Sequence, residues 1–558
     1  MPRTSARTAP DPTSRPAPAW LLHPLRWQRA PVPWAAVGRG ALGAGPLLAL
    51  ALATGHPAAG VLAGLGAMLA GVNDRPGTRR RGLVHIGLPA LAGTAGICAG
   101  SLLNAPGLPS WWAVPVLFAL GLFSGAVSAT TPVSSAAAMQ LLVTTTVGAG
   151  MPLPGAAWFK ALCFLGGACW LLALRLVLRP PRPSGGALPG ERAALAEVFT
   201  ALADALDAVG RPGAEAARRR LTGALDRADE ALRLTRLLRP VRRAGPAELL
   251  FAERLAAATA LCEASVALLR EGRVLPSRVA DGPRRLARAV REGRRPGPLP
   301  APVAGTAASR HFDRTLLEAA VVFGRSRPAG DGADPHAVPS PRHPALRHRR
   351  TALGPAGLEY GLRVAVCVSA SAAVALTLGS EHWFWLPVTA AFLVKPDLGP
   401  LFSRVVNRFA GTAAGVLVFA GLGTVADGVL PSGVGWPVPV VAVAGALIPV
   451  ATRHFAFQTG VVTVLVLALL HTVGDTGAAG PRLTHTAVAC ALVLLAGHLP
   501  FLVAPHARPR QRLAAALHRT RAYVAHVLAD PAGEPGEAER RALRRAAYRA
   551  LGEARAAA

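Results

Sequence analysis

Lysine is almost absent from this chain of 558 residues: Lys160 and Lys395 are the only two, although lysine and arginine together number 60. A phosphate-binding P-loop needs a lysine directly after a glycine, where its ammonium group reaches the nucleotide phosphates. Lys160 follows Phe159 and Lys395 follows Val394, so the chain contains no such loop. The sequence therefore argues against an ATP-driven pump, unless a partner supplies the ATPase.

Cysteine is also scarce, and the motifs of common enzyme and metal sites are missing. The six cysteines form no CxxC pair, which argues against a zinc ribbon or a dithiol redox centre. No HExxH, GxSxG or glycine-rich phosphate loop occurs, and His343 and His348 lack matching carboxylates. We therefore expect that the protein is not an enzyme and has no metal site and no cofactor.

Acidic residues are few: 30 aspartates and glutamates stand against 60 basic residues, a formal net charge of +30. The chain is also 52% hydrophobic, with a mean hydropathy of +0.37. This combination is unlike that of wholly soluble proteins and favours an inner-face membrane protein over a nucleic-acid binder. The expected partner is the lipid bilayer, with no nucleic acid.

Apolar runs of about 17–25 residues, the length needed to cross a bilayer, form two clusters. The first cluster has about six runs, near 35–54, 57–73, 83–104, 111–130, 133–150 and 157–178. The second also has about six, near 358–379, 383–399, 405–425, 436–452, 454–474 and 483–504. The sequence therefore predicts an all-α polytopic membrane protein built from two repeats of about six transmembrane helices.

The predicted domains follow from these clusters and from the polar stretches around them. Residues 179–350 show helical periodicity, and Leu195, Val198, Phe199, Leu202 and Leu206 form a stripe expected to face a core. The domains are a disordered cytoplasmic arm (1–34), a first transmembrane half (35–178), a cytoplasmic helical domain with flexible linkers (179–350), a second transmembrane half (351–505) and a cytoplasmic helical tail (506–558).

The tail contains an arginine-rich amphipathic helix, with Leu513, Leu517, Tyr523 and Val527 among its apolar positions. Two interpretations stay open for this helix. It packs on the soluble helices of the middle domain, or it lies on anionic lipid.

Arginines lie on one side of the predicted membrane, as the positive-inside rule expects of cytoplasmic loops. They occur in the N-terminal arm, in the loop 74–81, throughout the middle domain and in the loop with Arg404 and Arg408. Basic residues are almost absent from the loops near 54–57, 104–110, 379–382 and 426–435. We therefore expect a multi-pass protein of the cell membrane with both termini and the middle domain in the cytoplasm. Lys160 and Arg482 are the exceptions, expected at or near the outer face.

The two halves are similar to each other at an offset of about 320 residues, as in an internal structural repeat. Gly93-Thr94-Ala95-Gly96 matches Gly411-Thr412-Ala413-Ala414-Gly415, and Gln140, before a threonine-rich run, matches Gln458. An even number of spans gives both copies the same orientation. This implies a pseudo-twofold axis along the membrane normal, with a site at the interface.

The second half carries a specific set of motifs: Trp385-Leu386-Pro387-Val388-Thr389, Lys395-Pro396-Asp397-Leu398-Gly399, Arg404, Asn407-Arg408 and Gly411-Thr412 with Gly415. Over about 355–505 this pattern resembles the fusaric acid resistance (FUSC) or aromatic acid exporter family, and it is similar to the plant aluminium-activated malate transporters. The resemblance is weaker over 40–178. It implies six spans per half with a cytoplasmic helical domain, and export of aromatic or other organic acids.

The candidate substrate-binding residues lie in one stretch of the second half: Lys395, Arg404, Arg408, Trp385, Thr389 and Asp397. A carboxylate that crosses a low-dielectric region needs cationic partners, and a tryptophan ring can stack on an aromatic acid. The alternative interpretation is that the cations are positive-inside anchors, that Asp397 pairs with an arginine, and that the tryptophan belongs to the interfacial aromatic belt.

Proton coupling would need ionisable or polar groups in or beside the spans, and the candidates are His454, Gln458, His382 and Asp475. For His382 and Asp475, a solvated position at the outer edge is the alternative. Gly411, Thr412 and Gly415 are expected to pack helices, because small residues spaced by four let two helix backbones approach closely.

Three functions remain open from the sequence. The first is a secondary, proton-driven exporter of small organic or aromatic carboxylate anions. The second is a passive organic-anion channel of the same fold. The third is a non-transporting membrane scaffold whose middle domain recruits cytoplasmic partners. The sequence also leaves open whether the chain assembles into a homo-oligomer.

Overall fold

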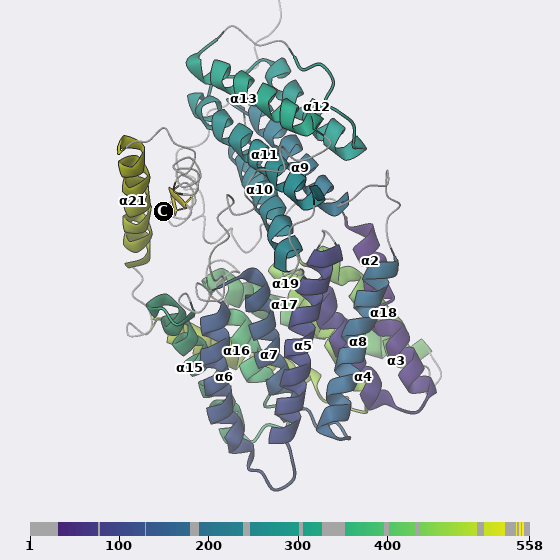
Figure 1. Ribbon diagram of the computed structural model, residues 1–558. Helices are drawn as coiled ribbons and strands as arrows, with labels where there is room; N and C mark the ends of the chain where they lie inside the picture. Colours follow the sequence, from purple (N-terminus) through teal and green to yellow (C-terminus); the bar gives the residue numbers. More distant parts are fainter. Residues whose placement is uncertain are drawn as a thin grey trace, which may run out of the picture. The chain divides into compact units, whose positions relative to one another are not determined.

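The computed structural model is all-helical wherever it is described. It describes residues 32–75, 79–128, 130–178, 189–211, 213–237, 246–300, 305–325, 352–394, 401–429, 435–498 and 507–529, together with 543, 546–547 and 550–551. Every regular element in these ranges is a helix (Figure 1). The prediction of an all-α polytopic membrane protein is confirmed.

The chain forms two compact units. Unit 1 comprises residues 1–74, 85–178 and 345–504, and unit 2 comprises 75–84, 179–344 and 505–558. Unit 1 thus contains nearly all of both apolar clusters, and unit 2 contains the polar middle segment and the tail.

The helices of unit 1 coincide with the apolar runs of the sequence. In the first half they are α2 (Trp34–Ala41), α3 (Ala44–Ala53), α4 (Pro57–Val72), α5 (Arg79–Leu103), the short 3-10 helix η2 (Ser110–Trp112), α6 (Ala113–Ser128), α7 (Pro132–Gly150) and α8 (Ala157–Val177). In the second half they are α15 (Pro355–Thr377), α16 (Trp385–Val394), α17 (Leu401–Val429), α18 (Pro437–Ala451), α19 (Phe455–His471) and α20 (Ala479–His498).

Local sequence signals set several helix ends. Proline occupies the first turn of α4, α7, α15 and α18, where its missing N–H costs no hydrogen bond. At the start of α7, the Thr131 hydroxyl accepts a hydrogen bond from the Ser134 amide (3.1 Å), and the Ser134 hydroxyl accepts one from the Thr131 amide (3.0 Å). Gly379, after α15, has a φ of 62°, a left-handed conformation that glycine adopts without strain.

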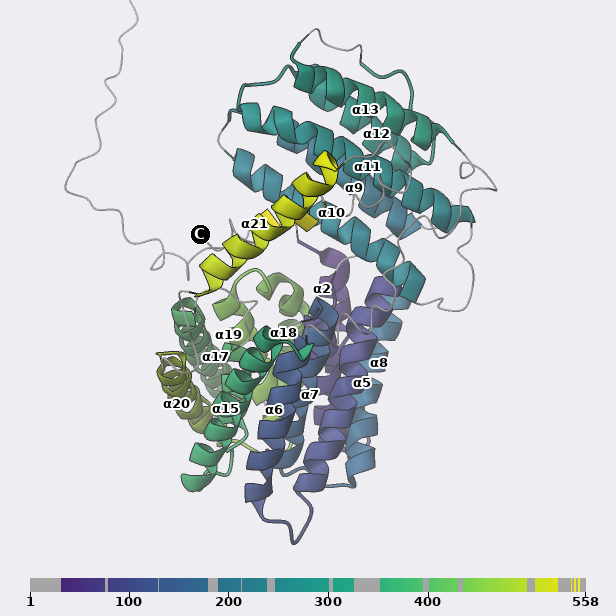
Figure 2. The same cartoon turned by 60° about the vertical axis from the view of Figure 1, so that its left-hand side comes forward.

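The two halves pack reciprocally, as an internal repeat requires. Helix α6 of the first half packs on α15, the first helix of the second half, and α18 packs on α2 and α3 (Figure 2). Within the halves, α4 packs on α8 in the way that α16 packs on α20. In both copies, a glycine lets the third span approach the backbone of the fifth. A Cβ on Gly96 of α5 would lie only 2.6 Å from the Leu141 carbonyl oxygen of α7, and a Cβ on Gly411 of α17 would lie 2.2 Å from the Ala456 carbonyl oxygen of α19, so no larger side chain fits at either position.

Among the described residues of the membrane domain, seven helical stretches are long and apolar enough to cross a membrane, and four shorter helices are also apolar: α4, α16, α18 and α19. The shortest, α16, has ten residues, of which nine are buried. Protein rather than lipid surrounds such a helix, so it does not need the full bilayer length. Because α4 and α16 are the second spans of their halves, short helices occupy corresponding positions in the repeat, which is typical of transporter substrate sites.

Unit 2 has its own apolar core. Its helices are α9 (Pro189–Asp207), α10 (Ala214–Leu237), α11 (Pro246–Glu271), α12 (Ser277–Glu292), α13 (Ala307–Gly324) and α21 (Ala507–Leu528). The predicted stripe on α9 is confirmed as core, since Val198, Phe199 and Leu202 are fully buried. Phe199 also packs edge-to-face on Phe323 of α13, with ring centroids 5.1 Å apart.

Candidate anion-binding site

Two arginines are buried in the second half of unit 1. Arg408 lies on the second turn of α17 and is 5% exposed, and Arg482 lies on the first turn of α20 and is 3% exposed. Helix α16 packs against both α17 and α20. The two guanidinium groups are near enough for their charges to repel each other. Two positive charges are therefore buried on helices that both pack against α16.

The side chains that face these guanidinium groups are aromatic. The Arg482 guanidinium carbon lies 4.1 Å from the centroid of the Trp385 ring, and that of Arg408 lies 5.1 Å from the Phe392 ring. Among the described residues, no carboxylate lies within 4.0 Å of either arginine. A cation–π contact offsets only part of the cost of burying such a charge, about 2 kcal/mol when desolvated. The site therefore has a positive charge that a bound anion can neutralise.

Several buried polar atoms beside the arginines have no hydrogen-bond partner in the described part of the chain. They are Nη1 of Arg482, Nε of Arg408, Nε1 of Trp385 and Oγ1 of Thr389. Buried polar groups nearly always find partners in folded proteins. Such a group of unsatisfied atoms on α16, α17 and α20 is the pattern expected of a polar ligand site.

Arg404, one helical turn before Arg408, makes a different kind of contact, to a backbone carbonyl group. It is buried, and its Nη1 donates a hydrogen bond to the carbonyl oxygen of Leu393 at 2.5 Å. Leu393 lies in the last turn of α16, where carbonyl groups lack partners within the helix. Arg404 therefore fixes the end of α16 against α17. The other two predicted residues of this stretch, Lys395 and Asp397, lie outside the described residues.

The four candidates for proton coupling fall into two groups at opposite ends of α19. His382 Nε2 and Asp475 Oδ2 are 2.7 Å apart, and this pair joins the α15–α16 loop to the α19–α20 loop. His485 of α20 is close enough to feel the charge of His382. His454 and Gln458 lie instead at the start of α19, which is 17 residues long, or about 25 Å.

The glycines of the candidate packing motif lie where two helices touch. A Cβ on Gly415 would lie 2.7 Å from the Gly460 carbonyl oxygen, so both Gly411 and Gly415 face α19. Thr412, between them, is fully buried, and its hydroxyl has no hydrogen-bond partner among the described residues.

Sequence reasoning missed Arg482, His485 and Phe392 as site residues. The sequence predicts only a position at or near the outer face for Arg482, and the structure adds that its side chain is buried against Trp385. The internal repeat holds the signal that could have found it. Lys160 and Arg482 both occupy the first turn of the sixth span, and Lys160 is also buried, at 8% exposure. Because two cations occupy equivalent positions in the repeat, we expect them to do more than set the orientation of the neighbouring loops in the membrane.

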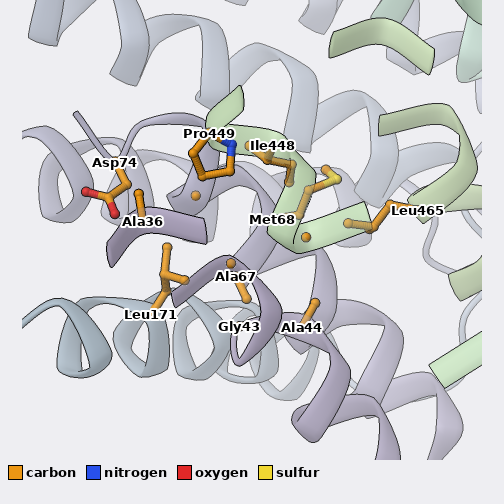
Figure 3. Close-up of a pocket in the computed structure, with 13 residues that line it drawn as sticks. Ala36, Gly43, Ala44, Ala67, Met68, Asp74, Leu171, Ile448, Pro449 and Leu465 are labelled. Atoms are coloured by element: carbon orange, nitrogen blue, oxygen red, sulfur yellow. The ribbon is translucent and has the colours of Figure 1, made fainter. Parts of the chain in front are cut away.

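A second charge cluster lies in the first half of unit 1. The buried Asp74 carboxylate accepts hydrogen bonds from Arg39 at 2.7 and 3.0 Å and also pairs with Arg175. Asp74 lies at the edge of a small, largely apolar pocket between α2, α3, α4 and α18 (Figure 3). Both arginines pair with this carboxylate, so neither is left free to bind an anion. The cluster instead connects the helices that carry these residues.

Comparison with known proteins finds a family match within the second half. Residues 368–496 match the family described as fusaric acid resistance protein-like, and they contain all of the site described above. A stretch of 63 residues is 38% identical to an uncharacterized protein (slr1298) of Synechocystis sp.. This stretch covers 11% of the present chain and only 8% of that relative. No solved structure matches the chain.

Proposed function

We propose that this chain, an integral membrane protein whose residues 368–496 belong to the fusaric acid resistance protein-like family, is a secondary exporter of small organic, chiefly aromatic, carboxylate anions. The observation that carries the proposal is the buried pair Arg408 and Arg482, which has no carboxylate partner among the described residues. Such a pair is costly in a membrane domain unless an anion binds there.

Each residue of the site has a part in the proposed mechanism. The guanidinium groups of Arg408 and Arg482 bind the substrate carboxylate, since charge-assisted hydrogen bonds to arginine are the strong ones. Trp385 offers an unpaired N–H, which suits a polar substituent on an aromatic substrate. Arg404 acts as a positioning residue, because it holds the end of α16.

We also propose that protons drive export through His382 and Asp475. These residues link two loops of the second half at 2.7 Å, and histidine is the side chain that exchanges protons near neutral pH. The contact is an ion pair only while His382 is protonated. Gain and loss of that proton would strengthen and weaken the link between the loops that precede α16 and α20.

The orientation of the chain is part of the proposal. The arginine-rich loops and unit 2 lie on the cytoplasmic side, as the positive-inside rule predicts. The His382–Asp475 end of the bundle then faces the outside, where protons are abundant.

The direct test is transport into inverted membrane vesicles with an imposed pH gradient. The probes are benzoate, 4-hydroxybenzoate and succinate. We expect saturable uptake of the aromatic acids, reduced about 10- to 100-fold in Arg408→Gln and Arg482→Gln, the loss expected for charged hydrogen bonds. Arg288→Gln, on the exposed face of α12 in unit 2, removes the same charge outside unit 1 and should transport normally.

The outcomes separate the alternatives. Uptake that both arginine variants retain at wild-type levels, in well-folded protein, would overturn the assignment of the site. Uptake that does not saturate and ignores the pH gradient would indicate a passive channel of the same fold. A loss of pH-gradient dependence in His382→Gln, with downhill transport retained, would support the proposed proton path.

A further inference from the structure

The helix α21 differs in composition from every span of unit 1. It has five arginines and no acidic residue among its 22 positions. Helix α20 ends at His498 and α21 begins at Ala507, so only residues 499–506 connect them. At about 3.5 Å per residue, this connection reaches less than about 30 Å from the end of the last span. The connection is therefore short enough for this strongly positive helix to reach the membrane surface.

Helix α21 exposes a continuous apolar stripe. Its members are exposed by between 45% and 80%: Leu513 at 62%, Leu517 at 50%, Val524 at 45% and Leu528 at 80%. At 100° per residue, these positions fall within about 60° of one another on the helix surface. Ala516, by contrast, is fully buried, so the helix already has a protein-facing side that is distinct from the stripe.

Charged side chains border the exposed stripe rather than interrupt it. Arg521 follows Leu517 by four residues, and both it and His518 are exposed. Arginine can lay its aliphatic part along an apolar surface while its guanidinium stays in the polar headgroup layer. An aliphatic stripe beside cations, with no acidic residue, is the pattern of helices that lie in the interface of an anionic membrane.

We propose that α21 binds the surface of an anionic lipid bilayer, with Leu513, Leu517, Val524 and Leu528 inserted below the headgroups. The occupant is lipid because of the charge of the helix and its short connection to the last span. A protein partner would need an acidic groove of matching shape, whereas a leaflet with anionic headgroups supplies both charge and apolar depth. This inference does not depend on the transport function.

The test uses the full-length chain in nanodiscs of phosphatidylcholine alone or with 30 mol% phosphatidylglycerol. Hydrogen exchange of residues 507–528 is followed by mass spectrometry. We expect slowing of at least about fivefold in the anionic discs, weakened at high salt because ionic attraction is screened. Exchange in the α9–α13 bundle should be the same in both discs and serves as the internal control.

Four variants decide between lipid and protein as the occupant. Leu517→Gln and Leu513→Gln keep the charge but should remove most of the lipid-dependent slowing, and Arg521→Gln should remove part of it. Ala525→Gln, at an exposed position outside the stripe, should leave the slowing unchanged. Equal protection of α21 in both discs, insensitive to salt and to Leu517→Gln, would overturn the proposal. That result would mean that another part of the protein covers the stripe.

Discussion

At the residue scale, burial has opposite consequences for different side chains. Arg408 and Arg482 are buried in unit 1, and in the function proposed above their charge is neutralised by a bound anion. Cys262 of α11 is equally buried in unit 2, but its neutral thiol needs no partner. Burial first, and the nearby charge of Glu263 second, raise the pKa of this thiol to about 12.

This shift makes Cys262 inert in the folded protein. The thiolate is the reactive form, and at pH 8 almost none is present when the pKa is about 12. We expect no labelling of Cys262 by a soluble maleimide at pH 8, and full labelling once the chain is unfolded in guanidinium chloride. Peptide mass spectrometry measures both. Rapid labelling of the native protein would show that α11 opens easily.

The Asp74 cluster is the second residue-scale feature with a clear expectation. Asp74→Asn leaves Arg39 and Arg175 buried without their shared counterion, and losing one partner of a buried ion pair costs about 3–5 kcal/mol. We expect a lower thermal unfolding midpoint in detergent. Adding Arg39→Gln should lower the midpoint less in the Asp74→Asn background than in wild type. Equal effects in both backgrounds would contradict the ion-pair interpretation.

At the element scale, glycine decides how closely α17 approaches α19. Gly411 and Gly421 lie on the same helix, but a Cβ on Gly411 would lie 2.2 Å from the Ala456 carbonyl oxygen, whereas a Cβ on Gly421 meets nothing within 4 Å. Alanine substitutions at these two glycines therefore distinguish the effect of helix packing on stability from the effect of helix propensity.

We expect Gly411→Ala to destabilise the protein by about 1–3 kcal/mol, because the two backbones must move apart. Gly421→Ala should be neutral or stabilising by up to about 1 kcal/mol, since alanine favours helix. Thermal unfolding in detergent measures both variants. A neutral Gly411→Ala would show that α17 and α19 adjust without cost.

At the scale of the whole molecule, the two compact units lead us to expect separable folding. The α9–α13 bundle has its own core, in which Phe199, Leu261 and Phe312 are almost fully buried. Residues 189–325 expressed alone should give a helical protein with a cooperative thermal transition, measured by circular dichroism. A gradual, non-cooperative transition would mean that the bundle needs unit 1 or α21.

The internal repeat also acts at this scale, and it shows how far sequence reasoning extends. The sequence predicted that Gly411 and Gly415 pack helices and matched this segment to Gly93–Gly96, and the structure shows that both segments pack the third span on the fifth. The sequence did not reveal that Lys160 and Arg482 are buried, because a cation at the start of an apolar run also fits a solvated helix end. Only the packing of α20 on α16 distinguishes the two situations.

The sequence by itself determined the fold class, the approximate ends of the membrane helices and the similarity of residues 368–496 to the fusaric acid resistance protein-like family. These properties follow from apolar run length, arginine distribution and local motifs, all of which act over short stretches of chain. Only the tertiary structure decided which polar residues meet. Trp385, Arg408 and Arg482 come from three helices, and His382 and Asp475 lie 93 residues apart yet touch. Such contacts depend on how helices pack, and helix packing is set by side-chain fit across the whole bundle rather than by any one segment.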